Sequence, residues 1–382
     1  MSTTAGAGAR ALAALFALTL LAAACGDDGD EAATGTSDGG AGEAPSDELS
    51  PVTLQLQWFA QGQFGGYYAA AAEGYYEDEG LDVEIVEGGV DIVPQTQLAT
   101  GAADFAIAWV PKALASREQG EGITNIGQIF QRSGTLQVSW ADDQIGGPED
   151  LEGKKVGNWG FGNEFELFAG LKQAGIDPES DVTLVQQQFD MQALLAREID
   201  AAQAMTYNEY AQLLETTDPD TGELYTADDF TVIDWNDVGT AMLQDAVWAD
   251  TERLDDPAYR ETAVKFLRAS MRGWMFCRDE ADACVAHVLE AGPTLGESHQ
   301  RWQVAEVNKL IWPSPGGIGV MDETLWDQTV DVAVEQGIVA EVPDADAYTS
   351  ELAEEALAGL EGDDTTGEGY EAPEVVLKEG GA

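Results

Sequence analysis

The fold is decided by residues 52–108, which begin with VTLQLQW at position 52 and end with DFAIA at positions 104–108. The first segment alternates apolar and polar residues, which is the period of a β-strand. Residues 64–76 are rich in alanine and aromatic residues and predict a helix, and residues 80–86 predict a turn and a second strand. A second helix is predicted over residues 91–100. The order β-α-β-α-β favours a parallel sheet covered by helices.

The same pattern begins again after residue 150. Strands are predicted at 155–157, 182–185 and 201–205, and helices at 164–174 and 191–198. The chain from about residue 257 onward predicts mainly helices. We therefore expect an α/β protein of two lobes with a helical C-terminal part. A ligand cleft between the lobes follows, because ligands of such sheets bind beyond the carboxyl ends of the strands.

The predicted organisation has six parts. The crossing strands near 136–140 and 235–242 are expected to form the hinge between the lobes. The parts are an export signal at 1–25, an acidic flexible tether at 26–50, lobe one at 51–140, lobe two at 141–238, a return to lobe one with C-terminal helices at 239–350, and a helix end with a loose acidic tail at 351–382.

The composition excludes several classes of function. The 382 residues include 17 Lys and Arg against 71 Asp and Glu, for a net charge of −54. Such a surface repels nucleic acids, and Lys154-Lys155 is the only adjacent basic pair. Two histidines and three cysteines make a zinc site of these ligands unexpected, so we expect neither a metal nor a cofactor. Solubility in salty or alkaline surroundings explains the acidity better than cation binding does.

The N-terminus has the pattern of an export signal. One charge, Arg10, precedes an apolar run that is too short to span a bilayer, and Ala22-Ala23-Ala24 leads directly into Cys25. This end resembles a bacterial lipobox, although Leu21 lies four residues before the cysteine where the pattern places it three before. We expect Cys25 to carry a lipid on the outer face of the membrane. The alternative is cleavage at Ala24 by a conventional peptidase.

The other two cysteines, Cys277 and Cys284, suggest a disulfide in an exported protein. In one continuous helix they would lie about 10 Å apart, which is too far to bridge. A break near residues 278–280 would bring them together. No ligand role is expected for either.

Aromatic and amide side chains follow most of the predicted strands, and these positions are the candidate ligand-binding residues. Flat aromatic faces stack on a heterocycle, and amides and carboxylates pair with its nitrogen and amino groups. The nearby carboxylates and the shortage of arginine argue against a strongly anionic ligand. The candidates are Trp58, Gln61, Phe64, Trp109, Trp159, Gly160, Gly162, Asn163, Glu164, Gln188, Asp190, Tyr207, Asn208, Glu209 and Trp235.

Several of these residues also have a purely structural interpretation. Trp58 and Trp109 can be core residues at strand ends, and Phe64 has the helical spacing of a core residue. Glu164 can stabilise the first turn of its helix, and Asp190 can cap the next one. No Ser/His/Asp or Cys/His set is assembled by the strand ends, so nucleophilic catalysis has no candidate.

Seven motifs in order make the chain resemble the NMT1/THI5-like family of bacterial solute-binding proteins, relatives of the alkanesulfonate binders. The resemblance covers roughly residues 51–340. It is closest to members implicated in importing thiamine-pyrimidine precursors or riboflavin-like compounds. The motifs are Gln57-Trp58-Phe59, Phe64 to Ala70, Gly74-Tyr75-Tyr76, Gly80 to Val83, Gly160 to Glu166, Met205 to Glu209 and Gly316 to Asp322.

The resemblance implies a type II periplasmic-binding-protein fold, in which two lobes close on a ligand. It also implies an ABC permease and its ATPase as partners, with the binding protein itself a monomer. The family further contains enzymes that make the thiamine pyrimidine with pyridoxal phosphate on a lysine and a histidine of their own. The matching positions here are Ala108 and Lys112, so the resemblance implies binding and not catalysis.

The main hypothesis is therefore a lipid-anchored protein that captures a small aromatic nitrogen heterocycle for an ABC importer. An alkanesulfonate or nitrate binder of the same fold is the first alternative, and Lys or Arg lining the cleft would support it. A pyrimidine-synthesising enzyme and a ligand sensor without transport are the others.

Overall fold

The computed structural model describes residues 49–380. The predicted export signal with Cys25, and the tether up to residue 48, lie outside the described residues. Among residues 49–380, no helix has the length and apolar character needed to span a bilayer.

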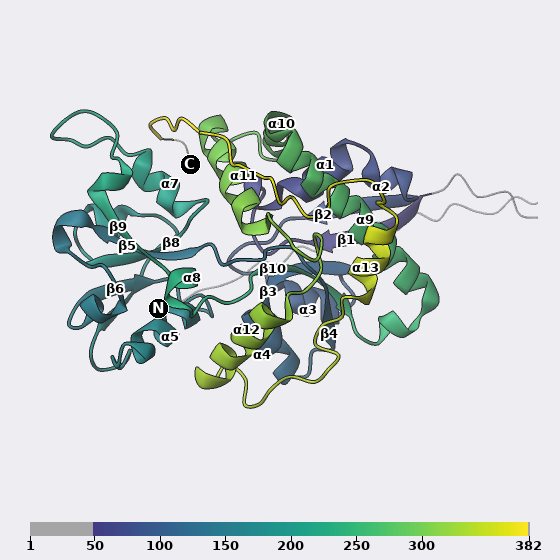
Figure 1. Cartoon of the computed structure of the whole chain (residues 1–382), viewed down its shortest axis with the longest axis horizontal. Helices are drawn as coiled ribbons and strands as arrows, with labels where there is room; N and C mark the ends of the chain where they lie inside the picture. Colours follow the sequence, from purple (N-terminus) through teal and green to yellow (C-terminus); the bar gives the residue numbers. More distant parts are fainter. Residues whose placement is uncertain (1–48, 381–382) are drawn as a thin grey trace, which may run out of the picture. The chain divides into compact units, whose positions relative to one another are not determined.

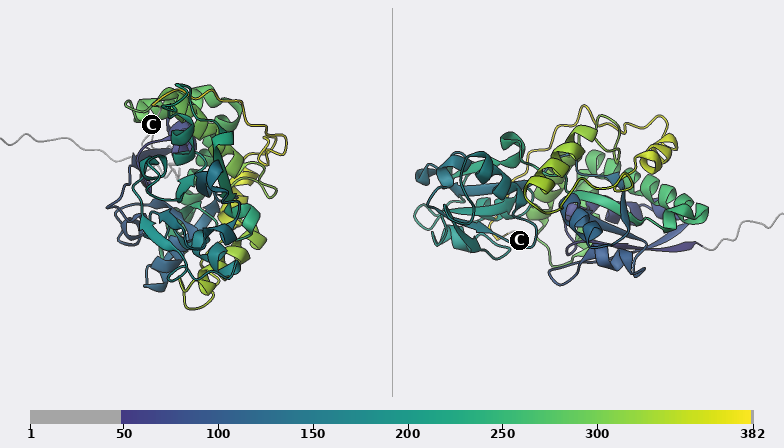
Figure 2. Two further views of the ribbon diagram at one scale, coloured as in Figure 1. Left: turned by 90° about the vertical axis from the view of Figure 1, so that its left-hand side faces the viewer. Right: turned by 90° about the horizontal axis from the view of Figure 1, so that it is seen from below.

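Two five-stranded sheets form the centres of two lobes (Figures 1 and 2). The sheet of lobe 1 has the order β2-β1-β3-β10-β4, in which β1 is parallel to β2 and β3, and β10 is antiparallel to both of its neighbours. Its strands are β1 (Ser50–Gln55), β2 (Leu81–Val86), β3 (Phe105–Trp109), β4 (Ile123–Gln128) and β10 (Asp245–Asp250).

The sheet of lobe 2 repeats this topology, with the order β7-β6-β8-β5-β9. Strand β6 is parallel to β7 and β8, and β5 is antiparallel to β8 and β9. Lobe 2 is drawn in teal at the left of Figure 1. Its strands are β5 (Thr135–Trp140), β6 (Lys155–Asn158), β7 (Thr183–Gln186), β8 (Ala201–Met205) and β9 (Phe230–Asp234).

The chain crosses between the lobes twice, at residues 129–134 and at residues 239–244. The predicted lobe boundary at residue 140 and the predicted hinge at 136–140 are therefore wrong, because strand β5 lies inside the sheet of lobe 2. The second predicted hinge segment overlaps the second crossover only in part, because Trp235–Val238 form a helix of lobe 2. The local sequence pattern of β5 predicts a strand but does not show to which of the two sheets that strand belongs.

Helices cover both faces of each sheet. In β3 all five residues are buried, with Phe105 and Ile107 packed on one side and Ala106 and Ala108 on the other. The predicted helix over 64–76 is broken by Gly74, whose φ is 75°. The helices are α1 (Gly65–Ala72), α2 (Tyr75–Asp78), α3 (Pro94–Ala99), α4 (Val110–Glu118), α5 (Phe165–Gln173), α6 (Gln192–Leu195), α7 (Glu209–Leu214), α8 (Trp235–Val238), α9 (Pro257–Asp279), α10 (Ala281–Ala291), α11 (Glu297–Ile311), α12 (Glu323–Glu335) and α13 (Glu351–Ala358).

The predicted disulfide is present. Cys277 and Cys284 are joined, with their Cα atoms 5.0 Å apart. Helix α9 ends at Asp279, and Glu280, whose φ of −126° is not helical, separates it from α10. This break replaces the straight helix that would have kept the two cysteines apart.

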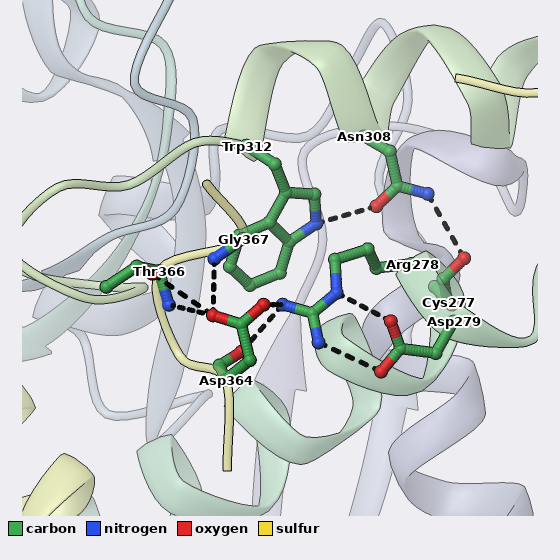
Figure 3. Close-up of polar contacts among 8 residues, drawn as sticks. All are labelled: Cys277, Arg278, Asp279, Asn308, Trp312, Asp364, Thr366 and Gly367. Atoms are coloured by element: carbon green, nitrogen blue, oxygen red, sulfur yellow. Dashed lines mark hydrogen bonds and ion pairs between the residues drawn. The ribbon is translucent and has the colours of Figure 1, made fainter. Parts of the chain in front are cut away.

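The C-terminal tail is held against the body, so the expectation of a loose tail is wrong. Arg278 donates to the Asp364 carbonyl oxygen at 2.6 Å and lies over the ring of Trp312 (Figure 3). The Asp364 side chain in turn accepts from the Gly367 N–H at 2.9 Å. An acidic composition predicts a solvated segment, but these contacts depend on a distant arginine.

Helices α1 and α9 approach closely in lobe 1. A Cβ at Gly273 would lie 2.0 Å from the Gly66 carbonyl oxygen, and a Cβ at Gly66 would lie 2.2 Å from the Trp274 ring. Both positions therefore need glycine, because any side chain there would force the two helices apart.

We expect Gly273→Ala to lower the free energy of unfolding by about 2 kcal/mol through overpacking of this crossing. Urea denaturation measures the change. Gly369→Ala is the matched control, because a Cβ at Gly369 meets nothing within 4 Å. Equal stability of the two variants would contradict this account of the α1–α9 contact.

Candidate functional site

A cavity of about 480 Å³ lies between the two lobes, within the size range of small-molecule sites. Lobe 1 contributes the segment after β1, the loop before α3 with the start of α3, and residues along the length of α4. Lobe 2 contributes the loop between β6 and α5, the residue Phe189, and the segment after β8. These segments follow the carboxyl ends of strands, where the sequence predicts the ligand to bind.

Nine of the predicted site residues line this cavity and six do not. The lining residues are Trp58, Gln61, Trp109, Trp159, Gly162, Asn163, Tyr207, Asn208 and Glu209. The residues that the structure places elsewhere are Phe64, Gly160, Glu164, Gln188, Asp190 and Trp235.

Two of the six are core residues, and a role in the ligand site is wrong for them. Phe64 is fully buried in the core of lobe 1. Trp235 is fully buried in lobe 2 and packs so closely on Gly170 that a Cβ there would lie 2.4 Å from its ring. Both side chains are packed in a core, and neither is among the residues that line the cavity.

The other four of the six shape the loops around the cavity. Asp190 accepts at 2.9 Å from the N–H of Gln192, the first residue of α6, and Glu164 accepts from the Gly162 N–H at 3.0 Å. Gly160 has a φ of 71°, a left-handed turn conformation that favours glycine. Gln188 is exposed. A strand end identifies the right loop but not which of its side chains enters the cleft.

Sequence reasoning missed several lining residues. Phe189 lies between two predicted candidates. Lys112 lies three residues after Trp109, and residues at this spacing share one face of a helix, so the position of Trp109 could have indicated Lys112. The loop before α3 follows a strand whose end has no aromatic or amide residues, so our criterion did not select this loop. The missed residues include Gln57, Gln63, Val90, Ile92, Val93, Lys112, Phe161, Phe165, Phe189 and Met205.

Aromatic rings form the cavity wall and meet across the cleft. Trp58 of lobe 1 and Phe189 of lobe 2 have ring centroids 4.8 Å apart. Phe189 also lies nearly parallel to Trp159, at 6.0 Å and 20°. Phe161, in the same loop as Trp159, is 80% exposed and extends this apolar surface outward. Aromatic rings of both lobes are thus available at this surface to stack on a flat apolar ligand.

Lys112 connects the lobes at the cavity. Its Nζ donates to Asn163 Oδ1 of lobe 2 at 2.8 Å and lies 4.7 Å from the centre of the Trp109 ring. Burial between the lobes lowers the pKa of Lys112 to about 8, whereas the charges of Glu164 and Asp245 act in the opposite direction.

Helix α11 connects the lobes on another side of the cavity. Gln303 Nε2 donates to Gln61 Oε1 of lobe 1 at 3.2 Å and to Asn208 Oδ1 of lobe 2 at 3.1 Å. His299, one turn earlier, lies 2.9 Å from Asn208 Oδ1 and 2.9 Å from Glu215. Two cavity residues from different lobes, Gln61 and Asn208, are thus held by one buried amide.

Glu166 on α5 binds both crossover segments. Its Oε2 accepts from the Ser133 hydroxyl at 3.0 Å and its Oε1 accepts from the Met242 N–H at 2.7 Å. Burial raises the pKa of Glu166 to about 8, and the donors from Met242 and Ser133 oppose this shift. The two segments are also joined directly, since Gln244 Oε1 accepts from the Gly134 N–H at 2.8 Å.

The family model described as NMT1/THI5 like matches residues 61–283, which is more than half of the chain. The chain belongs to the NMT1/THI5-like family. The matched range includes most of the cavity and both crossover segments.

Two relatives align with most of this chain, and another aligns with a shorter part of it. The riboflavin-binding protein RibY of Chloroflexus aurantiacus is 27% identical over 317 residues, covering 80% of this chain and 86% of its own length. The formylaminopyrimidine-binding protein of Halalkalibacterium halodurans is 24% identical, with coverages of 80% and 92%. The 4-amino-5-hydroxymethyl-2-methylpyrimidine phosphate synthase of Legionella pneumophila is 29% identical, but with coverages of only 37% and 45%.

Solved structures share the fold. The periplasmic aliphatic sulphonate binding protein SsuA from Escherichia coli superimposes with a TM-score of 0.59 at 15% identity, covering 78% of this chain and 91% of that one. The predicted type II periplasmic-binding-protein fold of two α/β lobes is therefore confirmed for this NMT1/THI5-like chain.

The lowered pKa of Lys112 predicts how stability depends on pH. The pKa of Lys112 is about 8 in the folded protein and has its ordinary value of 10.5 in the unfolded chain, so between these pH values the unfolded chain binds more protons than the folded one. The free energy of unfolding therefore gains a contribution that rises with pH across this window. Lys112→Met should remove this rise, which urea denaturation at the two ends of the window measures.

The control is Lys172→Met, an exposed lysine of lobe 2 that donates to Gln336 Oε1 at 2.6 Å. It should keep the pH dependence of the wild type. If Lys112→Met keeps it as well, Lys112 is not desolvated between the lobes.

Proposed function

We propose that this protein is an extracytoplasmic solute-binding protein that captures a small aromatic nitrogen heterocycle by closure of its two lobes. The observation that carries the proposal is the aromatic wall of the cavity, in which Trp58 of lobe 1 meets Phe189 of lobe 2. Amides of both lobes lie in the same cavity and suit ring nitrogens and exocyclic amino groups. Two curated relatives that align over most of their length are named for riboflavin and formylaminopyrimidine, which are both such heterocycles.

Closure is proposed to turn on the two crossover segments. Glu166 binds both of them, so lobe 2 would pivot about two segments that are held together rather than about a loose linker. The cross-cleft contacts of Lys112 with Asn163 and of Gln303 with Gln61 and Asn208 then belong to the closed arrangement.

The proposal includes export, a lipid on Cys25, and delivery of the ligand to an ABC permease with its ATPase. The body would be a monomer tethered by the acidic segment that follows the cysteine. A sensor without transport would share every feature of the cavity, and neighbouring genes for a permease and an ATPase would separate the two.

Binding without catalysis fits the residues at the cavity. Ala108 occupies the position that the synthases of this family fill with a lysine, and its side chain is buried in the core beneath α4. The ammonium of Lys112 is already bound by Asn163, and neither histidine is among the residues that line the cavity.

An anionic ligand is the second candidate, because Lys112 lines the cleft. Its charge has nearby counter-charges, however, since Glu164 and Asp245 both stabilise the ammonium form. No arginine lines the cavity among the described residues, so the bidentate contacts that favour sulfonates are not offered there. This balance favours a neutral heterocycle.

The direct test measures the melting temperature and tryptophan fluorescence of the purified protein with formylaminopyrimidine, hydroxymethylpyrimidine, riboflavin, taurine and nitrate. A ligand at 100 times its Kd should raise the free energy of unfolding by about 2.7 kcal/mol. We expect a shift with a pyrimidine or with riboflavin. A shift with taurine or nitrate alone would overturn the heterocycle in favour of an anion.

A pair of tryptophan variants separates binding from stability. Trp159 and Trp235 both have a buried indole N–H with no partner among the described residues, but only Trp159 lines the cavity. Trp159→Phe should weaken binding of the panel ligand by about tenfold through loss of a donor. Trp235→Phe should leave the Kd unchanged, whatever it does to the melting temperature. Equal affinities of the two variants would remove Trp159 from the site.

A further inference from the structure

One buried carboxyl group, Asp245 of strand β10, faces the amides of the cavity without lining it. Its Oδ1 accepts from Gln57 Nε2 at 2.5 Å and its Oδ2 accepts from Gln63 Nε2 at 2.8 Å. Burial raises the pKa of Asp245 to about 7, while the Gln63 and Gln57 donors and the charge of Lys112 lower it. Above this pKa both oxygens can only accept, so each glutamine must present its NH2 group to Asp245.

The orientation continues along a chain of amides. Gln63 has its NH2 on Asp245, so its Oε1 is free to accept, and it accepts from Gln61 Nε2 at 2.7 Å. Gln61 Oε1 then accepts from Gln303 Nε2 at 3.2 Å. An amide turned the other way would place two donors or two acceptors together at every link. Asp245 therefore sets the direction of Gln63 and, through it, of Gln61.

The other glutamine bound to Asp245 is Gln57, which lines the cavity. Its Nε2 is bound by Asp245, and its Oε1 accepts no hydrogen bond from residues 49–380. The polar atom that Gln57 offers to a ligand is therefore a carbonyl oxygen. From lobe 2, the buried indole N–H of Trp159, also without a partner in that part of the chain, offers a donor.

We propose that Asp245 is a specificity-determining residue of the ligand site, which positions Gln57 so that its carbonyl oxygen selects ligands with an N–H donor. This rests on the proposed function and names the chemistry of its ligand. An N–H donor of the ligand matches the Gln57 oxygen, as on the imide edge of a flavin or the amino edge of an aminopyrimidine. An N-alkylated ring would leave the Gln57 oxygen unpaired.

The test compares each heterocycle with an analogue whose donor is blocked. Isothermal titration above the pKa of Asp245 gives the Kd of riboflavin against 3-methylriboflavin, and of formylaminopyrimidine against its N,N-dimethylamino derivative. The wild type should prefer the N–H form by about tenfold or more. In Asp245→Asn the amide at position 245 can donate as well as accept, so Gln57 can turn and the preference should fall to about one.

Two further variants exclude a purely structural role. Gln57→Met removes the selecting oxygen itself and should abolish the same preference. Asp104→Asn neutralises another carboxylate of lobe 1, which accepts from the Thr53 N–H at 2.9 Å and does not line the cavity, and it should keep the preference. Loss of stability alone changes both Kd values of a pair together and leaves their ratio unchanged.

A ligand-free measurement separates this inference from the proposed function. In spectra of the full protein labelled with 15N-glutamine, Asp245→Asn should shift the side-chain NH2 signals assigned to Gln57 and Gln63. Unchanged signals, or an unchanged preference in Asp245→Asn, would overturn the role of Asp245 while the binding function stands. A wild type that binds none of the heterocycles would overturn the binding function, whatever the NH2 signals show.

Discussion

The geometry of the cleft depends on the hydrogen bonds of the buried Glu166 carboxyl group. From helix α5 of lobe 2, this group accepts a hydrogen bond from a hydroxyl of the first crossover segment and one from a backbone N–H of the second. A buried polar group of this kind is costly unless it is fully paired, so both crossovers are held in place together. The residues of the two cavity walls therefore face each other in a defined register, and the closure proposed above would turn about this point.

The contacts across the cleft divide into an apolar and a polar set. Trp58 and Phe189 meet ring against ring, and rings tolerate ligands of several outlines. The side-chain amides connected through Gln303 can be oriented in one way only. The series of hydrogen bonds ends at the carboxylates of Asp245 and Glu209, and both carboxylates accept hydrogen bonds. In the proposed function, the apolar set favours flat molecules in general and the polar set discriminates among them.

Much of the fold can be predicted from the sequence, because strand and helix periods in residues 52–108 and 155–205 are local properties. Trp58, Trp109 and Trp159 were predictable for the site because each lies at the end of a strand or within three residues after it. Trp235 fits the same rule and lies in the core, since its side-chain direction is set by packing on Gly170. The docking of the tail on Arg278 and the place of β5 in lobe 2 depend on distant partners, which local patterns do not reveal.

The antiparallel strands β5 and β10 have a consequence for the order in which the chain can fold. Lobe 2 has all of its strands in one continuous stretch, from Thr135 to Asp234. Lobe 1 begins first, at Ser50, but its sheet stays divided until β10 arrives between β3 and β4. During synthesis, which starts at the N-terminus, all strands of lobe 2 are therefore available before lobe 1 receives its internal strand β10. The lobe that starts the chain is the last to be finished.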